Sequence, residues 1–85
     1  MTSHVLKVDP GYYDAIVNGL KTFEIRKNDR GYRVGDLLRL KEYDPGTEKY
    51  TNRTVRMIVQ YIIGHEDFPE GIPEGYVVMA IRKAV

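Results

Sequence analysis

The chain has 85 residues, no cysteine, 13 basic and 12 acidic side chains, and a formal net charge of +1. This length predicts a single small domain over residues 1–85, with one core. Without cysteine, disulfides, thiolate metal sites and a cysteine nucleophile are excluded. The first residues lack the basic and apolar regions of a signal peptide, and no apolar run approaches the length of a membrane span. We therefore expect a cytoplasmic protein that does not bind membranes.

The first elements in the chain are predicted to be a strand over residues 4–8 and a helix over about 11–18. Asp9 followed by Pro10 predicts the helix start, because an N-cap acid precedes proline at the first helical position. Gly19 is expected to end the helix, since glycine adopts a positive φ without steric cost. The apolar side of the helix is predicted to consist of Tyr12 or Tyr13, Ile16 and Leu20.

A second strand is predicted over residues 22–26. Its alternation places Thr22, Glu24 and Arg26 on one face and points Phe23 and Ile25 into the core. A polar, cation-rich loop over residues 27–33 follows.

The second half of the chain predicts three more strands. The third covers 37–43, and a turn at 44–47 joins it as a hairpin to a long fourth strand over 50–63, which we expect to bend. An acidic loop over 64–74 precedes a last strand over 75–82. The core faces are predicted to carry Leu38 and Leu40, then Val55, Met57, Val59, Tyr61 and Ile63, then Val77, Met79 and Ile81. The fold class is thus mixed α+β, a small barrel of about five strands with one helix between the first two.

Charge is unevenly distributed along the chain. Residues 21–56 carry ten basic and six acidic side chains, a balance of +4, whereas residues 62–76 carry four acidic side chains and no basic one. Such segregation steers anionic ligands to one side of a protein. The main candidate site lies at the predicted helix-to-strand boundary, where Lys21, Glu24 and Arg26 follow Gly19. Lys21 has the wrong parity for the face of Glu24, but a bend before the strand would bring it back.

The spacing Gly-x-Lys-x-x-Glu-x-Arg at residues 19–26 resembles the signature of the activating signal cointegrator homology (ASCH) superfamily. The helix end at residues 16–19, the segment 33–36 before an apolar strand, and the closing segment 75–79 are also similar to that family. The resemblance covers nearly the whole chain and is strongest to a compact bacterial and phage branch. It implies a PUA-like β-barrel with a cleft beside the first helix, lined by the signature residues.

What the resemblance implies for function is RNA binding, the role proposed for ASCH domains, or hydrolysis. Some small bacterial members are amidohydrolases that deacetylate N4-acetylcytidine nucleosides. Their central lysine matches Lys21, and the threonine beside it corresponds to the position of Glu24 here. Their further catalytic glutamate comes from a helical insertion before the last strand. In this chain the acidic loop over 64–74 occupies that region, and nothing in the sequence aligns Glu66, Glu70 or Glu74 with it.

The residues themselves leave several interpretations of the cluster open. The simplest is an ion-pair network without function. A second is an RNA or nucleotide pocket, in which Arg26 grips a phosphate or base edge, Lys21 adds a charge and Glu24 orients both. In that case Lys27, Arg30 and Arg33 extend the site as phosphate contacts along the loop, and the Tyr32 ring stacks on a base. The candidate ligand-binding residues are then Lys21, Thr22, Glu24, Arg26, Lys27, Arg30, Tyr32 and Arg33, with Tyr12 and Tyr13 as further stacking candidates.

In the enzymatic alternative, Lys21 is the nucleophile or general base, or Glu24 activates water. A third alternative is a protein-interaction module that uses exposed strand edges. We expect no cofactor and no metal, because His4 and His65 are isolated from other ligands in the sequence. Asp36 is expected to bond the backbone at a strand start. Tyr61 and Tyr76 are expected to be structural.

Overall fold

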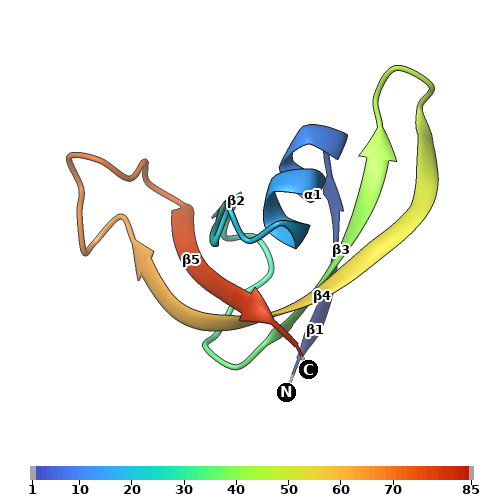
Figure 1. The fold of residues 1–85 in the computed structure, drawn as a ribbon. Helices are drawn as coiled ribbons and strands as arrows, with labels where there is room; N and C mark the ends of the chain where they lie inside the picture. The colour runs from blue at the N-terminus through green and yellow to red at the C-terminus, as the bar shows by residue number, and fades with distance from the viewer. Residues whose placement is uncertain (1, 85) are drawn as a thin grey trace.

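The computed structural model of the protein describes residues 2–84. Its elements follow the predicted order of one strand, one helix and four strands (Figure 1). Their bounds are β1 (Ser3–Val8), α1 (Pro10–Val17), β2 (Phe23–Lys27), β3 (Leu37–Asp44), β4 (Lys49–Gly64) and β5 (Tyr76–Lys83). Within residues 2–84, no helix is long and apolar enough to cross a membrane.

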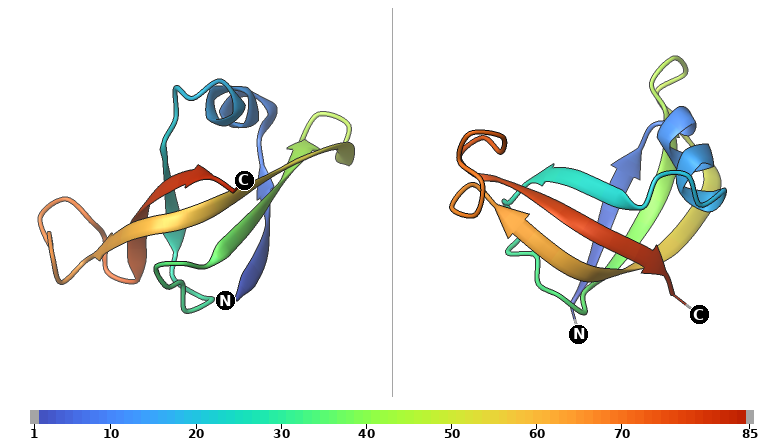
Figure 2. Two further views of the ribbon diagram at one scale, coloured as in Figure 1. Left: turned by 60° about the horizontal axis from the view of Figure 1, so that its bottom comes forward. Right: turned by 60° about the vertical axis from the view of Figure 1, so that its left-hand side comes forward.

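The five strands form one sheet in the order β1-β3-β4-β5-β2. The β1–β3 pair is parallel, and the β3–β4, β4–β5 and β5–β2 pairs are antiparallel. The sheet curls into a half-barrel, with α1 on its concave side (Figures 1 and 2). Strands β1 and β2 are therefore the two edges, and α1 connects the end of one to the start of the other.

Side chains of two arginines join these two edges. Arg26 on β2 donates from Nη2 to the carbonyl of Lys7 at 2.8 Å, and Arg30 donates from Nη1 to the carbonyl of Val5 at 2.9 Å. Both carbonyls belong to β1, whose strand partner among residues 2–84 is β3. Guanidinium groups thus supply hydrogen bonds along an edge that has no second strand beside it.

The core lies between the concave face of the sheet and α1. It contains Tyr13 and Ile16 from the helix and the predicted inward residues of β3 and β5. The predicted helix start at Asp9 and Pro10 is confirmed, and Gly19 follows the helix with a φ of 76°. Leu20, in contrast, is 80% exposed, so the apolar side of the helix ends one turn earlier than predicted. The helix stops at Val17, and the left-handed glycine turns Leu20 away from the core.

Strand β4 changes its inward face at a β-bulge. Val59 pairs with Ile81 and Tyr61 with Ala80, which leaves Gln60 as the extra residue. Beyond the bulge Ile62 packs against the core, and Tyr61 is 66% exposed. The predicted core face of this strand is therefore correct for Met57 and Val59 and wrong for Tyr61 and Ile63. The expected structural role of Tyr61 fails with it, and Tyr76 is also exposed.

Strand β2 has the opposite orientation to the prediction. Phe23 and Ile25 are exposed, whereas Glu24 is only 4% exposed. Glu24 lies opposite Met79, a fully buried residue of β5, so it belongs to the inner face of the sheet. Alternation was predicted correctly, but apolar side chains were assigned to the inside. Here a carboxylate is buried instead, because two cations neutralise it.

Candidate functional site

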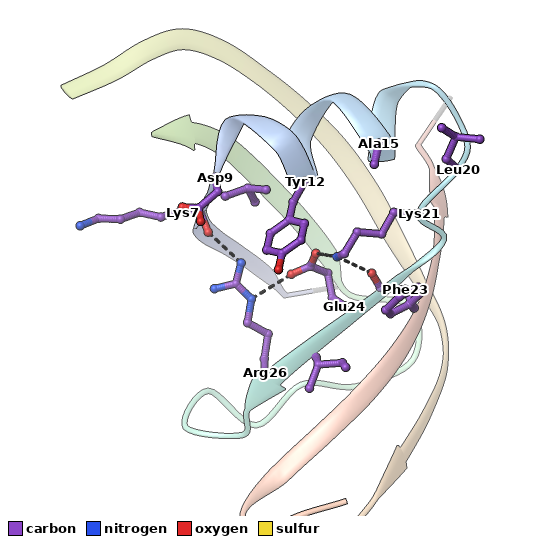
Figure 3. A pocket seen from close by; sticks show the side chains of 11 residues that line it. Lys7, Asp9, Tyr12, Ala15, Leu20, Lys21, Phe23, Glu24 and Arg26 are labelled. Atoms are coloured by element: carbon purple, nitrogen blue, oxygen red, sulfur yellow. Dashed lines mark hydrogen bonds and ion pairs between the residues drawn. The ribbon is translucent and has the colours of Figure 1, made fainter. Parts of the chain in front are cut away.

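An open cleft of about 690 Å³ lies between α1, the end of β1 and β2 (Figure 3). The three charged residues predicted from the sequence, Lys21, Glu24 and Arg26, line it together. Strand parity alone would have placed Lys21 on the other face. Its lining consists of Lys7, Val8, Asp9, Tyr12, Ala15, Leu20, Lys21, Phe23, Glu24, Ile25 and Arg26. We call it the signature cleft, and we call Lys21, Glu24 and Arg26 the signature cluster.

Glu24 is the centre of the signature cluster. Lys21 donates from Nζ to Oε1 at 2.5 Å, and Arg26 donates from Nε to Oε2 at 2.9 Å. Each carboxylate oxygen therefore holds one cation, as Figure 3 shows. A buried carboxylate requires such pairing, because an isolated charge in the interior is costly.

The end of α1 brings Lys21 to Glu24. The backbone amides of Leu20 and Lys21 both donate to the carbonyl of Ala15, at 2.9 and 3.0 Å. This closes the helix around the left-handed Gly19 and directs Lys21 back under α1. The predicted bend before the strand is thus present.

Both cations have a second bond and a spare donor. Lys21 Nζ also donates to the carbonyl of Phe23 at 2.7 Å, and Arg26 Nη2 donates to that of Lys7. These bonds leave one ammonium hydrogen of Lys21 and the Nη1 group of Arg26 without a protein acceptor within residues 2–84. The side chains of Lys21 and Arg26 are 15% and 27% exposed. The cleft therefore offers fixed, partly desolvated donors to a ligand.

Aromatic rings flank these donors. Lys21 Nζ lies 5.3 Å from the centre of the Tyr12 ring and 5.0 Å from that of Phe23. Tyr12 projects from α1 toward Glu24 and remains 59% exposed (Figure 3). Its ring is a flat surface beside the cluster, and such a surface suits a planar ligand.

The other predicted binding residues are dispersed. Lys27 is exposed and does not line the cleft, and the exposed Arg33 lies in the loop before β3. Arg30 is held at the edge of β1. Thr22 lines a separate depression of about 560 Å³ near the end of α1. A continuous phosphate track from the cleft along the loop is therefore absent among these residues.

Tyr32 occupies the core rather than the cleft. It is 7% exposed, and its ring packs edge-to-face against His4 with centroids 4.8 Å apart. Burial raises the pKa of its hydroxyl. The ring of Tyr32 is therefore not available to stack on a ligand. Of the predicted stacking candidates, Tyr12 is the one that lines the cleft.

His4 belongs to a buried polar pair. Its Nε2 lies 2.9 Å from Oδ2 of Asp36, which also accepts the backbone amide of Arg33 at 3.0 Å, as expected for a strand-start aspartate. Burial raises the pKa of Asp36, but hydrogen bonds from His4 and from the amides of Arg33 and Thr2 outweigh burial and lower it. This pair anchors β1 to the start of β3.

Sequence reasoning missed a second inner cluster around Glu42. Arg53 donates to both carboxylate oxygens, at 2.8 and 2.7 Å, and Thr51 donates at 2.5 Å. These bonds lower the pKa of Glu42 to about 2. Arg53 also donates to Asp14 on α1 and lies over the Tyr13 ring, so the cluster ties the β3–β4 hairpin to the helix. The available signal was parity, because Glu42 follows Leu38 and Leu40 at intervals of two.

The acidic side chains outside the two inner clusters form neither a metal site nor a part of the signature cluster within residues 2–84. Within residues 2–84, no three His, Asp or Glu side chains come together as a metal site requires. Glu66, Glu70 and Glu74 are exposed in the loop after β4, and none of them lines the signature cleft. Asp9 is the second carboxylate in its lining.

The fold and cleft define a small α+β half-barrel with a charged site beside α1. The chain belongs to the family described as "Domain of unknown function (DUF3850)", whose model matches residues 3–81. It is 34% identical over 67 residues to "Uncharacterized 12.9 kDa protein in GpA 3'region" of Escherichia phage P2. That match covers 79% of this chain and 60% of the phage protein, so the chain spans less than two thirds of its relative.

A solved structure has a similar fold. The crystal structure of hypothetical protein PH0355 matches with a TM-score of 0.64 at 15% identity. The match covers 99% of this chain and 100% of the other. At this identity the similarity extends to the fold alone.

Proposed function

We propose that the protein binds RNA, or a nucleotide, in the signature cleft. One observation carries the proposal. Buried Glu24 fixes Lys21 and Arg26, each with a spare donor, in the lining of an open cleft beside the exposed ring of Tyr12. The cleft volume of about 690 Å³ is within the usual range of roughly 300–1,000 Å³ for small-ligand sites.

The chemistry of the cleft matches the two parts of a nucleotide. A guanidinium and an ammonium group bind phosphate or the acceptor edge of a base. An exposed tyrosine ring stacks on a base, a contact worth about 1–3 kcal/mol. The resemblance of residues 19–26 to the ASCH signature, and the PUA-like barrel that it implies, support the same function.

Binding fits this geometry better than hydrolysis of an acylated nucleoside. Both candidate catalytic groups are engaged with each other, since Lys21 donates to Glu24 and Glu24 accepts on both oxygens. A general base or nucleophile directs a lone pair at the substrate, whereas Lys21 here donates its hydrogens and both oxygens of Glu24 are directed at protein cations. The signature cluster presents donors instead.

The test is an NMR titration of labelled protein with cytidine monophosphate and with a short single-stranded RNA. We expect amide shifts at residues 20–26 and around Tyr12. Lys21→Gln keeps a donor for Glu24 but loses the charge. We expect it to weaken binding of the monophosphate about tenfold to a hundredfold, as for a lost charged hydrogen bond of about 1.5–3 kcal/mol.

Lys27→Gln is the matched control, because it removes the same charge from an exposed position that does not line the cleft. Equal affinity of Lys21→Gln and wild type would refute binding in the cleft. Acetate released from N4-acetylcytidine by wild type, but not by Lys21→Gln, would support the hydrolase alternative instead.

A further inference from the structure

The outer face of the sheet carries a second group of cations, separate from the signature cluster. The strand register places five basic side chains at outward positions on neighbouring strands. Lys7 on β1 pairs with Lys41 on β3, and Arg39 on β3 pairs with Arg56 on β4. Arg82 on β5 pairs with Ile58, which lies two residues after Arg56 on β4. We call Lys7, Arg39, Lys41, Arg56 and Arg82 the outer cationic face.

Among residues 2–84, no carboxylate shares the outward positions of the sheet around these five cations. The other outward positions over the same part of the sheet hold Ser3, Val5, Leu37, Tyr43, Tyr50, Asn52, Thr54 and Ile58. Within residues 2–84, none of the five cations forms an ion pair with a carboxylate. Four of the five are exposed, and Lys41 is half-buried. The charge is therefore available to a partner.

Two pairs in this face set like charges directly against each other. Lys7 opposes Lys41, and Arg39 opposes Arg56. Like charges in opposed positions destabilise a sheet. A surface that only kept the chain in solution would gain more from mixing both signs. The arrangement is instead what an anionic ligand needs.

Aromatic rings lie at one end of the face. Tyr43 and Tyr50 pack edge-to-face with centroids 5.1 Å apart. Lys7 Nζ lies 4.4 Å from the Tyr43 ring centre, and Lys41 Nζ lies 5.0 Å from that of Tyr50. Tyr50 is 45% exposed. Cations beside an exposed ring, on a sheet, are the elements with which proteins bind single-stranded nucleic acid.

We propose that the outer cationic face binds the phosphate backbone of single-stranded nucleic acid. The five cations follow a diagonal across four strands, whose combined width is about 15 Å at the usual strand spacing. A flexible chain of phosphates follows such a line, whereas a compact anion reaches only part of it. Only Lys7 also lines the signature cleft, so binding at one surface can fail while the other persists.

The test measures fluorescence anisotropy of a labelled uridine RNA of about twelve nucleotides over a range of salt concentrations. If all five cations contact phosphates, log affinity falls with log salt with a slope of about −3.5, at about −0.7 per contact. For Arg39→Gln/Arg56→Gln we expect the slope to become shallower by about 1.4. Its thermal midpoint should equal or exceed that of wild type, because the opposed charges are gone.

The matched control, Lys27→Gln/Arg33→Gln, removes the same charge from two exposed positions outside the face. We expect its slope to remain that of wild type. Equal slopes for Arg39→Gln/Arg56→Gln and wild type would overturn the proposal. So would the same loss in both double variants, which would indicate net charge alone. Binding to acidic phospholipid vesicles, without binding to the RNA, would also overturn it.

Failure of this proposal is distinguishable from failure of the proposed function. Lys21→Gln should weaken binding of cytidine monophosphate and leave the contribution of Arg39 and Arg56 to the salt slope unchanged. The outer-face variant should show the reverse. Loss of monophosphate binding in Arg39→Gln/Arg56→Gln would mean that the two surfaces are not independent.

Discussion

The two faces of the sheet use charged side chains in opposite ways. On the inner face, Glu24 and Glu42 are buried, and each accepts hydrogen bonds from a basic side chain at both of its oxygens. On the outer face, five cations stand without a carboxylate partner within residues 2–84. Inner charges are fixed by the fold and therefore position donors accurately. Outer charges are not neutralised by such partners, and they add long-range attraction instead.

The largest expected effect concerns the centre of the inner face. Glu24→Ala leaves two cations without their buried acceptor, and we expect it to lower the free energy of unfolding by about 3 kcal/mol. Urea denaturation measures this loss. Glu66→Ala, in the exposed loop, is the control and should change stability by less than about 0.5 kcal/mol. Equal stability of Glu24→Ala and wild type would mean that the inner ion pairs do not hold the fold.

A second, pH-dependent effect concerns Glu42. Its pKa is about 2 in the folded protein and 4.5 ordinarily, so the unfolded state binds the proton more tightly. Its contribution to stability is complete above the ordinary pKa and is lost as the pH falls from about 4.5 to about 2. Chemical denaturation across this range should show a steeper loss in wild type than in Glu42→Gln. Equal losses of stability with falling pH in wild type and Glu42→Gln would contradict the lowered pKa of Glu42. Asp36, whose pKa is also lowered, contributes a similar acid loss to both proteins.

The smallest expected effect concerns the outer face. Because Arg39 opposes Arg56, Arg39→Gln should raise the free energy of unfolding by about 0.2–1 kcal/mol at low salt. Salt screens exposed charges, so the gain should shrink as salt is added. Thermal unfolding at two salt concentrations measures both changes. A loss of stability that salt does not affect would show that Arg39 packs against the sheet and is not repelled.

Local signals in the sequence predicted much of this fold. Gly19 marked the end of α1, the turn at 44–47 marked the hairpin, and the alternation of Leu38 and Leu40 gave the inward face of β3. These features depend on neighbouring residues alone. The meeting of Lys21 with Glu24 could also be predicted, because three residues and one bend separate them.

The errors came from interactions between distant segments. Glu24 is inside because Met79 pairs with it and because cations from both sides neutralise it, so apolar preference did not decide the parity of β2. The bulge at Gln60 is set by the partner strand β5 and carries no signal of its own. The outer cationic face depends on the register of four strands. The charge count over residues 21–56 indicated the excess of cations but not which side they share.

The arginines that join the edges of the half-barrel have a consequence for self-association. An uncovered edge strand is a template on which a second chain can add a strand, the first step toward aggregation. On β1 the carbonyls of Val5 and Lys7 are already occupied by Arg30 and Arg26. A chain adding there would have to displace two guanidinium groups, one of which belongs to the signature cluster. Arg26, which lines the cleft for a ligand, therefore also blocks the edge at which another copy of the chain would add a strand.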